Sequence, residues 1–415
     1  MSRFTIACFI LMMAQYRMRI LLVTPRLPYP PHRGDKLKIF NLIRQLSRRH
    51  EITLLSFVSS RKELRDVRFL QEYCARVFPI LLRPTRSILN CISGLFSKTP
   101  FQVAYYASRR MHRAIEEALE GGDFDLMHVH LIRMMQYSPG ANGRIPRVLD
   151  LTDAGSLYLK RFLQSEKQLF KRLFLSEELK RLTLYERKLE QFEMNLVCSQ
   201  IDREVLLNHA PTARIELLYN GIDLDYFTSD GTIHPDPLRI VYTGNMKYYP
   251  NLDGVFYLVN EILPRIRDRV SGVKTYIVGK DPPASVRRLA TSDIVITGFV
   301  PDIREYYLRS TVAVAPVRFG AGTLNKVLEP MALGVPVVAS SIAVGGLPVK
   351  NGRELLIADS PEEFADAVVR LFLDSPLHEC LAQNAMRLVR SSYGWETITA
   401  QLERYYESVS EKRDK

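Results

Sequence analysis

Residues 320–340 read GAGTLNKVLEPMALGVPVVAS, and this stretch decides what kind of fold surrounds it. It follows one short apolar run, TVAVAPV at 311–317, and ends in another, VPVVAS at 335–340. Runs of this length predict buried strands, and the glycine turn between them leads into a helix that we expect to begin near Leu324. A strand, a turn, a helix and a second parallel strand make up one unit of a doubly wound α/β sheet.

The same alternation of apolar runs and amphipathic stretches occupies both halves of the chain. The predicted strands are 19–25, 51–58, 125–131, 147–153 and 194–199 in the first half and 239–246, 274–280, 293–300, 311–317 and 335–340 in the second. The predicted helices are 36–49, 156–193, a helix from Asn251, and 360–374, which opens on the N-cap signature Ser-Pro-Glu-Glu. A linker rich in Gly, Asp and Pro separates the two series at 219–237. The sequence therefore predicts two Rossmann-like α/β domains.

The length of 415 residues also favours two domains, because single hydrophobic cores stop growing at about 250–300 residues. We expect an extension outside the fold at 1–17, a first domain at 18–215, a second domain at 216–395 and a C-terminal helix at 396–415. The apolar run IACFILMMA at 6–14 is too short to span a bilayer and has no convincing cleavage site. Met18 directly precedes the first strand and is the start that we expect for the natural chain.

Composition and charge narrow the classes of protein further. The five cysteines lie far apart without a C-x-x-C pair, which argues against a zinc ribbon or a disulfide scaffold and favours a reducing compartment. The net charge of +12 is uneven, since residues 1–215 carry 35 Lys and Arg against 20 Asp and Glu and the rest of the chain carries 22 against 25. A basic first half predicts an anionic partner, and a merely solvated basic surface is the alternative.

The turn at 320–323 has the chemistry of an anion site. Free N–H groups at a helix start bind phosphate with the help of the helix dipole. Lys326 and Glu329 share one helical face, where the ammonium could offset phosphate charge and the carboxylate could accept hydrogen bonds from ribose hydroxyls. An ordinary surface ion pair is the alternative. Gly244 and Gly279 end two further strands, where glycine lets a ligand approach the backbone.

Four segments of the second half resemble, in order, the donor domain of family 4 glycosyltransferases, which are two-domain enzymes of the GT-B type. They are LLYNGIDLDYF, YTGNMKYYPNLDGVFYLVNEILPRI, ITGFVPDIREYY and GTLNKVLEPMALGVPVVAS. The first half, with VTPRLPYPPHRGDKLKIFNLIRQLSRRHEITLLSF, resembles the sugar transferases of exosortase (PEP-CTERM) exopolysaccharide systems in bacteria. The resemblance implies two Rossmann-like domains facing a cleft, a nucleotide-sugar donor on the second domain, and a C-terminal helix that crosses back to the first.

By position, the resemblance assigns Glu329 to the ribose, the turn at 320–323 to the diphosphate, and the backbone around Phe299 and Val300 to the base. The predicted donor-binding residues are Gly244, Lys247, Gly279, Phe299, Val300, Gly320, Gly322, Thr323, Leu324, Lys326 and Glu329.

This sequence departs from the family in two places. Ala321 stands where the first Glu of the E-x7-E pattern would contact the donor sugar, and Lys247 is the only cation near the end of the first donor-domain strand. We therefore expect Lys326 to bind the diphosphate. The sequence has no P-loop, no G-x-G-x-x-G fingerprint and no D-x-D pair placed to hold a metal, so no metal or other cofactor is expected.

In the first half, the loop after the first strand is predicted to contact the acceptor or the donor phosphate, with a plain turn as the alternative. Its residues are Arg33, Gly34, Asp35 and Lys36.

Two strands of the first half carry the candidate catalytic side chains. His128 and His130 share one face of the 125–131 strand, and the resemblance places His130 in the cleft, although a strand histidine can equally be a core residue. Asp153 could orient the acceptor hydroxyl or act as its base, with Asp150 as the strand-buried alternative. The resemblance implies front-face transfer with retention, in which the leaving diphosphate takes the proton and no dedicated base is needed.

We therefore expect a cytoplasmic, metal-independent, retaining hexosyltransferase on the inner face of the cytoplasmic membrane. Its donor would be a UDP- or GDP-linked sugar and its acceptor a lipid-linked or growing exopolysaccharide. The basic, apolar segments 86–110 and 156–193 would meet an anionic bilayer, or would simply cover the first sheet. No nucleic-acid motif accompanies the charge, so no such partner is expected. The alternatives are a nucleotide-sugar epimerase or phosphorylase of the same fold and an inactive nucleotide-sugar-binding scaffold; the oligomeric state stays open.

Overall fold

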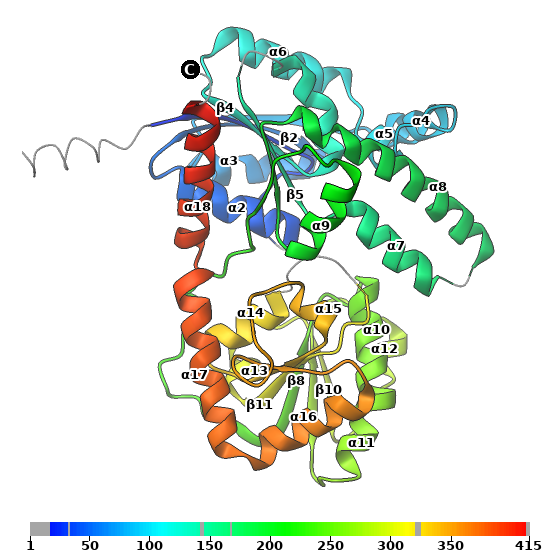
Figure 1. The fold of residues 1–415 in the computed structure, drawn as a ribbon, viewed down its shortest axis with the longest axis vertical. Helices are drawn as coiled ribbons and strands as arrows, with labels where there is room; N and C mark the ends of the chain where they lie inside the picture. The colour runs from blue at the N-terminus through cyan, green and yellow to red at the C-terminus, as the bar shows by residue number, and fades with distance from the viewer. Residues whose placement is uncertain (1–16, 32–33, 142–144, 167, 320–324, 412–415) are drawn as a thin grey trace, which may run out of the picture.

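The computed structural model describes residues 17–31, 34–141, 145–166, 168–319 and 325–411, and it forms two α/β units, one above the other in Figure 1. Each unit is built on one parallel sheet with helices packed on its faces. The prediction of two Rossmann-like units is confirmed.

The first sheet has seven parallel strands in the order β3-β2-β1-β4-β5-β6-β7. They are β1 (Arg19–Thr24), β2 (Glu51–Val58), β3 (Arg76–Leu81), β4 (Leu126–His130), β5 (Arg147–Thr152), β6 (Met194–Val197) and β7 (Ile215–Leu217). All five predicted strands are present. β3, which contains Pro79, and the three-residue β7 were too weakly patterned to predict. β7 continues the first sheet beyond the domain limit expected at 215, and the domain limits stay predictions.

The second sheet has six parallel strands in the order β10-β9-β8-β11-β12-β13. They are β8 (Asp236–Thr243), β9 (Lys274–Val278), β10 (Ile294–Gly298), β11 (Ser310–Ala315), β12 (Val337–Ala339) and β13 (Leu356–Ile357). The five predicted strands are present, and β13 has too few residues to show a period. In both sheets the strand order reverses beside the first strand, and ligands of open parallel sheets bind beyond the strand ends at such a point.

The helices cover both sheets. In the first unit they are α2 (Gly34–Leu46), α3 (Val67–Leu70), α4 (Pro84–Gly94), α5 (Phe101–Tyr105), α6 (Arg109–Gly121), α7 (Gly155–Ser165), α8 (Leu169–Glu186) and α9 (Gln200–His209). In the second they are α10 (Tyr249–Tyr257), α11 (Leu263–Arg267), α12 (Ala284–Arg287), α13 (Arg304–Leu308), α14 (Asn325–Ala332), α15 (Ser341–Val344), α16 (Pro361–Leu373) and α17 (Ser375–Ser392). Short 3-10 turns lie at Arg61–Asp66, Ile132–Ala141 and Arg187–Gln191, and a π-helical turn at Leu258–Ile262.

The observed helix bounds test the helices predicted at 360–374 and 156–193. The capping box at Ser360 is formed, with its side chain accepting from the Glu363 amide. The single helix predicted over 156–193 is wrong, because the chain breaks into α7 and α8. The backbone of Glu166 is extended there, and its carboxylate accepts the Gln168 amide at 2.9 Å, which favours a turn over a continuous helix.

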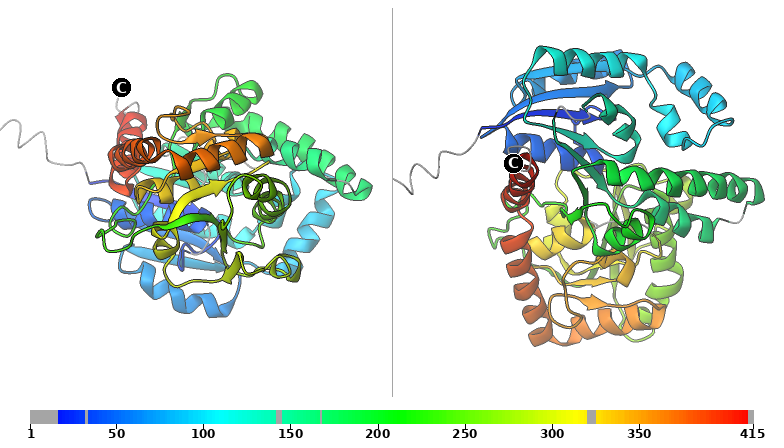
Figure 2. Two further views of the ribbon diagram at one scale, coloured as in Figure 1. Left: turned by 90° about the horizontal axis from the view of Figure 1, so that it is seen from below. Right: turned by 45° about the horizontal axis from the view of Figure 1, so that its top comes forward.

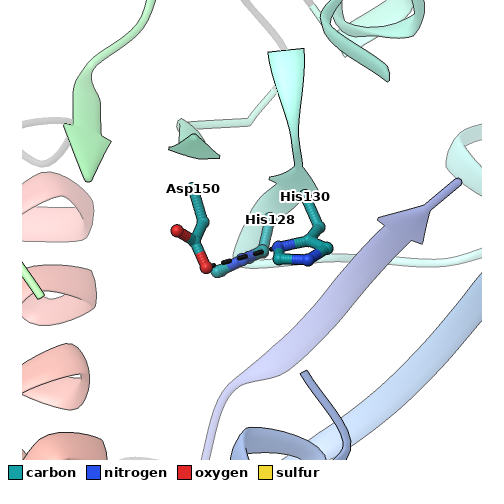
Figure 3. A group of neighbouring side chains, drawn as sticks. All are labelled: His128, His130 and Asp150. Carbon is teal, nitrogen blue, oxygen red and sulfur yellow. Dashed lines mark ion pairs between the residues drawn. The ribbon is translucent and has the colours of Figure 1, made fainter. Parts of the chain in front are cut away.

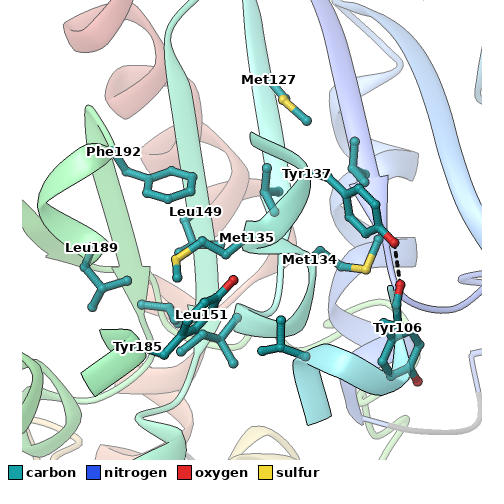
Figure 4. Packing of buried hydrophobic residues seen from close by; sticks show 14 of the residues in the cluster. Tyr106, Met127, Met134, Met135, Tyr137, Leu149, Leu151, Tyr185, Leu189 and Phe192 are labelled. Carbon is teal, nitrogen blue, oxygen red and sulfur yellow. Dashed lines mark hydrogen bonds between the residues drawn. The ribbon is translucent and has the colours of Figure 1, made fainter. Parts of the chain in front are cut away.

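Apolar side chains fill both faces of the first sheet. Figure 4 shows one of these clusters, in which Leu149 and Leu151 of β5 meet Met135, Tyr185 and Phe192. The hydroxyl group of the buried Tyr137 donates to the backbone oxygen of Tyr106, so this polar group is satisfied inside the core.

The C-terminal helix α18 (Trp395–Ser410) packs on the first unit, although it follows directly after the second (Figure 1). Ile398, Leu402 and Tyr406 belong to the apolar cluster that also contains residues of β1 and α2. The predicted crossing of this helix is therefore confirmed. Gly221 in the linker allows the crossing, because a Cβ there would lie 2.4 Å from the Trp395 ring. Within the described residues, no helix is long and apolar enough to cross a membrane.

Candidate active site

A cleft of about 370 Å³ opens between the two units. One wall is α2, the floor is the linker, and the other wall is the start of α14. Its lining residues are Pro31, Leu37, Phe40, Asn41, Arg44, Gly221, Ile222, Asp223, Tyr226, Phe227, Asn325, Glu329 and Trp395. An ion pair of 3.2 Å between Arg44 and Asp223 ties α2 to the linker beside it. Of the predicted site residues that the structure describes, Glu329 lines this cleft, whereas His130, Asp153 and Lys326 are not among its lining residues.

Glu329 is the carboxylate that α14 presents to this cleft. Its Oε2 accepts a hydrogen bond of 3.0 Å from the Tyr307 hydroxyl, and that hydroxyl also lies 2.7 Å from Thr243 Oγ1. Burial raises the pKa of Glu329, against the opposing effects of the Tyr307 hydrogen bond and the Lys326 charge. Tyr307 is fully buried, so it fixes the carboxylate from the protein side and leaves its cleft side for a ligand.

Lys326 lies one turn earlier on the same helix but points into a polar network. Its ammonium donates to Asn251 Oδ1 at 2.7 Å and to the Tyr242 hydroxyl at 3.1 Å, and it lies 4.3 Å from the centroid of the Tyr242 ring. Burial lowers the pKa of Lys326 to about 7, although Glu329 opposes the shift. Lys326 is therefore held by buried groups, and the alternative of an ordinary surface ion pair does not describe it.

The titration of Lys326 predicts proton uptake when a nucleotide diphosphate binds. Near pH 8 a lysine with a pKa of about 7 is mostly neutral, and an adjacent diphosphate favours its charged form. Calorimetry at pH 8 in buffers of different ionisation enthalpy is expected to show uptake of about one proton, and affinity is expected to fall by up to about tenfold per pH unit above pH 7.

Lys326→Met is expected to abolish this proton uptake and to weaken binding. The control is Lys274→Met at an exposed lysine that begins β9, which is expected to leave the uptake unchanged. Binding heats that do not depend on the buffer in the unmodified protein would show that Lys326 is not the diphosphate ligand.

The strand-end glycines have a packing role that the sequence did not reveal. A Cβ on Gly279 would lie 1.7 Å from the backbone oxygen of Gly244, and one on Gly244 would lie 2.8 Å from the side chain of Asn251. These glycines let the ends of β8 and β9 touch and admit the residue that binds Lys326. Direct contact of either glycine with a ligand stays a prediction.

The other residues predicted for the donor site differ in how exposed they are and in what they contact. Lys247 is exposed and forms an ion pair of 3.2 Å with Asp281, so its charge already has a partner on the surface. Phe299 directly follows β10 and is 74% exposed, and Val300 is half-buried against an apolar cluster of the second unit. Five predicted residues lie outside the described part of the chain: Arg33, Gly320, Gly322, Thr323 and Leu324.

Asp35 and its neighbours begin α2 rather than forming a free loop. Gly34 is the first residue of the helix, and a Cβ there would meet nothing within 4 Å. The Asp35 carboxylate forms an ion pair with Arg26 at 2.5 Å, which gives it a structural partner. The helix buries Lys38, Ile39 and Leu42, whereas Leu37 and Phe40 are only half-buried and line the cleft.

A buried group of charges lies at the ends of β4 and β5 (Figure 3). Lys38 Nζ lies 2.9 Å from Asp150 Oδ1, and His130 Nδ1 lies 3.3 Å from Asp150 Oδ2. Burial alone would raise the pKa of Asp150, but the Lys38 ammonium and the neighbouring His130 ring outweigh it and hold this pKa well below its usual range. Asp150 is therefore ionised, and its carboxylate faces His130 from inside the sheet.

His128 connects the same group to the C-terminal helix. It shares a face with His130, as predicted, and its Nδ1 lies 2.6 Å from the Tyr406 hydroxyl of α18. Burial lowers the pKa of His128 to about 3, so the ring is neutral and shares one hydrogen bond with the Tyr406 hydroxyl, whose direction depends on the tautomer of the ring. The crossing helix thus reaches the strand that carries the candidate catalytic histidine.

His128, His130 and Asp150 could together hold a metal ion, since one ligand atom of each lies within 4.8 Å of the others. Lys38 already binds Asp150 Oδ1, and the Tyr406 hydroxyl lies at His128 Nδ1, whereas Asp150 Oδ2, His128 Nε2 and both nitrogens of His130 are buried without a hydrogen-bond partner among the described residues. A buried ammonium 2.9 Å from the carboxylate also opposes a second cation. These residues fit an ion-pair network better than a metal centre.

Asp153 follows β5 and is half-buried beside a second carboxylate. Burial and the charge of Asp202 raise the pKa of Asp153 to about 7, against opposing effects of Arg133 and Lys38. Asp202 is fixed by hydrogen bonds from the Ser199 hydroxyl and the Ala154 amide. A carboxyl that titrates near neutral pH could accept a proton from an acceptor hydroxyl.

Sequence reasoning did not identify Lys38, Tyr307 or Tyr406. The sequence does contain one signal for Lys38: it lies four positions before Leu42 on the helix predicted at 36–49, so the two side chains share a helical face. Tyr307 and Tyr406 look like ordinary core aromatics, and only the three-dimensional structure shows where their hydroxyl groups point.

Comparison with known proteins gives these features a family. The family model described as "Glycosyltransferase Family 4" matches residues 39–226, and the one described as "Glycosyl transferases group 1" matches residues 237–374. The chain carries a family 4 and a group 1 glycosyltransferase domain. The enzyme class predicted from the sequence is thereby supported.

Similar proteins agree with this assignment. The structure of Alr3699/HepE from Anabaena in complex with UDP and glucose shares the fold with a TM-score of 0.65 at 15% identity, over 94% of this chain and 100% of that one. The fold is therefore of the GT-B type. An uncharacterized 44.6 kDa protein in the cps region of Klebsiella pneumoniae is 20% identical, over 90% of this chain and 96% of its own length. Phosphatidyl-myo-inositol mannosyltransferase of Mycobacterium tuberculosis is 24% identical, over 72% and 78%.

Proposed function

We propose that this glycosyltransferase moves a hexose, with retention, from a UDP- or GDP-linked sugar to a hydroxyl of a lipid-linked or growing cell-surface glycan. The observation that carries the proposal is the cleft between the two units, with Glu329 on its donor wall. The HepE structure, named as a complex with UDP and glucose, supports a nucleotide-sugar donor. The mannosyltransferase relative, whose name specifies phosphatidyl-myo-inositol, supports a lipid acceptor.

Each charged residue has a role in this reaction. Glu329 accepts hydrogen bonds from the ribose hydroxyls, and protonated Lys326 offsets the diphosphate charge as the donor breaks. His130, which the Asp150 carboxylate faces, binds a hydroxyl of the donor sugar. With retention, the leaving diphosphate takes the acceptor proton, and Asp153 positions the acceptor hydroxyl beside it. No step calls for a metal ion.

Ala321 stands where the family has a Glu that contacts the donor sugar, so we expect this difference to affect binding of the sugar rather than of the nucleotide. With no carboxylate side chain at that position, the sugar must be held by other groups, of which His130 is one. We place the protein on the inner face of the cytoplasmic membrane, in an exopolysaccharide system such as those that accompany exosortase, on the resemblance of its first half.

The direct test is incubation of the purified protein with labelled UDP- and GDP-hexoses and a bacterial lipid extract. We expect label to enter the lipid fraction, with the anomeric configuration of the donor retained in the NMR spectrum of the product and with a rate that EDTA leaves unchanged. Isomerised donor without transfer would show an epimerase instead. Tight nucleotide binding without turnover on any donor would show an inactive scaffold.

A further inference from the structure

Helix α4 presents its large apolar side chains to solvent and its small ones to the protein. The side chains that it and the next two residues expose, each more than half, are Ile88, Leu89, Ile92, Leu95 and Phe96. Ser87 and Gly94 are the buried residues of the helix. A surface helix of a globular protein normally turns its apolar stripe inward, so this inverted helix lacks the apolar partner for its outer face.

The first turns of α8 expose a second apolar set. Leu169, Phe170, Leu173 and Phe174 are between 53% and 86% exposed. The later part of the helix buries Leu182 and Tyr185 in the first core, so only its beginning projects from the domain. Figure 1 and both views of Figure 2 show α4 and α8 projecting from the same side of the first unit.

Buried charged residues fasten these two helices together. The Arg181 guanidinium of α8 donates to the backbone oxygen of Gly94 at 2.6 Å and lies 4.5 Å from the centroid of the Phe101 ring. Glu178 accepts the backbone amide of Phe101 at 2.8 Å, and the Phe101 ring stacks on Phe174 at 5.2 Å. Residues 84–96 and 169–174 are therefore joined into one surface, the α4–α8 platform, whose large apolar side chains are exposed.

The charges around the platform favour an anionic partner. Residues 83–98 include Arg83, Arg86 and Lys98 and no acidic residue, and α8 adds Lys171 and Arg172. Glu166, the one acidic residue in 155–174, lies only 4.0 Å from Lys171 Nζ. An apolar surface with a basic rim fits the interface of a bilayer that contains anionic lipid. A second copy of the chain would bring like charges together, which opposes a dimer through this face.

We propose that the α4–α8 platform inserts its apolar side chains into the headgroup region of an anionic membrane while its basic rim binds the lipid phosphates. The proposal rests on the proposed function for its purpose, since a seated enzyme would meet a lipid-linked acceptor. The structural argument for membrane binding rests only on the exposed side chains and charges of the platform.

The test is flotation of the full chain with vesicles of phosphatidylcholine, with and without phosphatidylglycerol. The unmodified protein is expected to float with the anionic vesicles, and Phe96→Ser together with Phe170→Ser is expected to lower its partition coefficient at least about tenfold. Both side chains are more than 85% exposed, at 91% and 86%, so the variant keeps its core. Leu373→Ser, which removes a 73% exposed leucine of the second unit, is the matched control and should float like the unmodified protein.

Residues 1–17 are the same in every variant, so a difference between them belongs to the platform. Unchanged flotation of the double variant, or equal flotation without phosphatidylglycerol, would overturn the proposal. So would a dimer in light scattering that the double variant converts to a monomer. Transfer to an acceptor in detergent separates the two proposals: the double variant is expected to keep this activity, whereas flotation without any transfer would contradict the proposed function and leave the platform standing.

Discussion

Asp150→Asn is expected to lower the free energy of unfolding by about 3–5 kcal/mol, because it leaves the Lys38 ammonium buried without its carboxylate. The side chains of both residues are almost fully buried, at 1% and 0% exposure, so water cannot replace the lost partner. Urea unfolding at pH 7, followed by circular dichroism, measures the change as a shift of the midpoint.

The control is Asp123→Asn, at an ion pair with Arg19 in which the aspartate is 91% exposed. Exposed pairs contribute about 0–1 kcal/mol, so this variant should unfold close to the unmodified protein. Lys38→Met combined with Asp150→Leu removes both charges and is expected to recover much of the loss. Equal, small effects of Asp150→Asn and Asp123→Asn would mean that the buried ion pair does not support the fold.

The sign of the pH dependence follows from the same pair. The pKa of Asp150 is held below its unfolded value of 3.8, so its contribution to stability is present above about pH 4 and is lost as the pH falls further. Asp153 has the opposite sign, because its pKa is raised to about 7. It binds a proton in the folded state that the unfolded state has released, so its contribution weakens stability as the pH rises from about 4 to 7.

The fold could be predicted from the sequence because period and composition are local properties. Each of the ten predicted strands is present, whereas β3, β7 and β13 are edge strands, of which β3 contains a proline and the other two have only three and two residues. The position of α18 followed only from the family resemblance, since nothing local in residues 396–415 says which unit it packs on.

The sequence predicted individual residues of the candidate site but not the contacts between them. Glu329 and His130 could be named from their positions, but their partners could not, because Tyr307 and Asp150 come from other elements. Lys326 shows the limit most clearly. The helix period places it beside Glu329, and only the packing of β8 and α10 turns its ammonium toward Tyr242 and Asn251.

Glu329→Ala is expected to weaken nucleotide diphosphate binding by about tenfold to a hundredfold, since a hydrogen bond to a charged group contributes about 1.5–3 kcal/mol. The carboxylate is held from behind by Tyr307, so its ligand-facing side is already oriented when the ribose arrives. Calorimetry with UDP and GDP measures the loss. Inorganic pyrophosphate, which has no ribose, is expected to lose much less affinity than UDP or GDP.

A thermodynamic cycle that combines Glu329→Ala with removal of the ribose hydroxyls from the nucleotide tests the role of Glu329. If Glu329 accepts hydrogen bonds from the ribose hydroxyls, the 2′,3′-dideoxy nucleotide already lacks the interaction that Glu329→Ala removes. The two losses then overlap, and the variant binds both nucleotides with nearly equal affinity. Additive losses would mean that Glu329 acts elsewhere, for example through the Tyr307–Thr243 hydrogen bond that lies behind it. Tyr307→Phe tells these readings apart, because it loosens the carboxylate without removing it: under ribose binding it should cost less affinity than Glu329→Ala and keep the preference for the hydroxylated ribose.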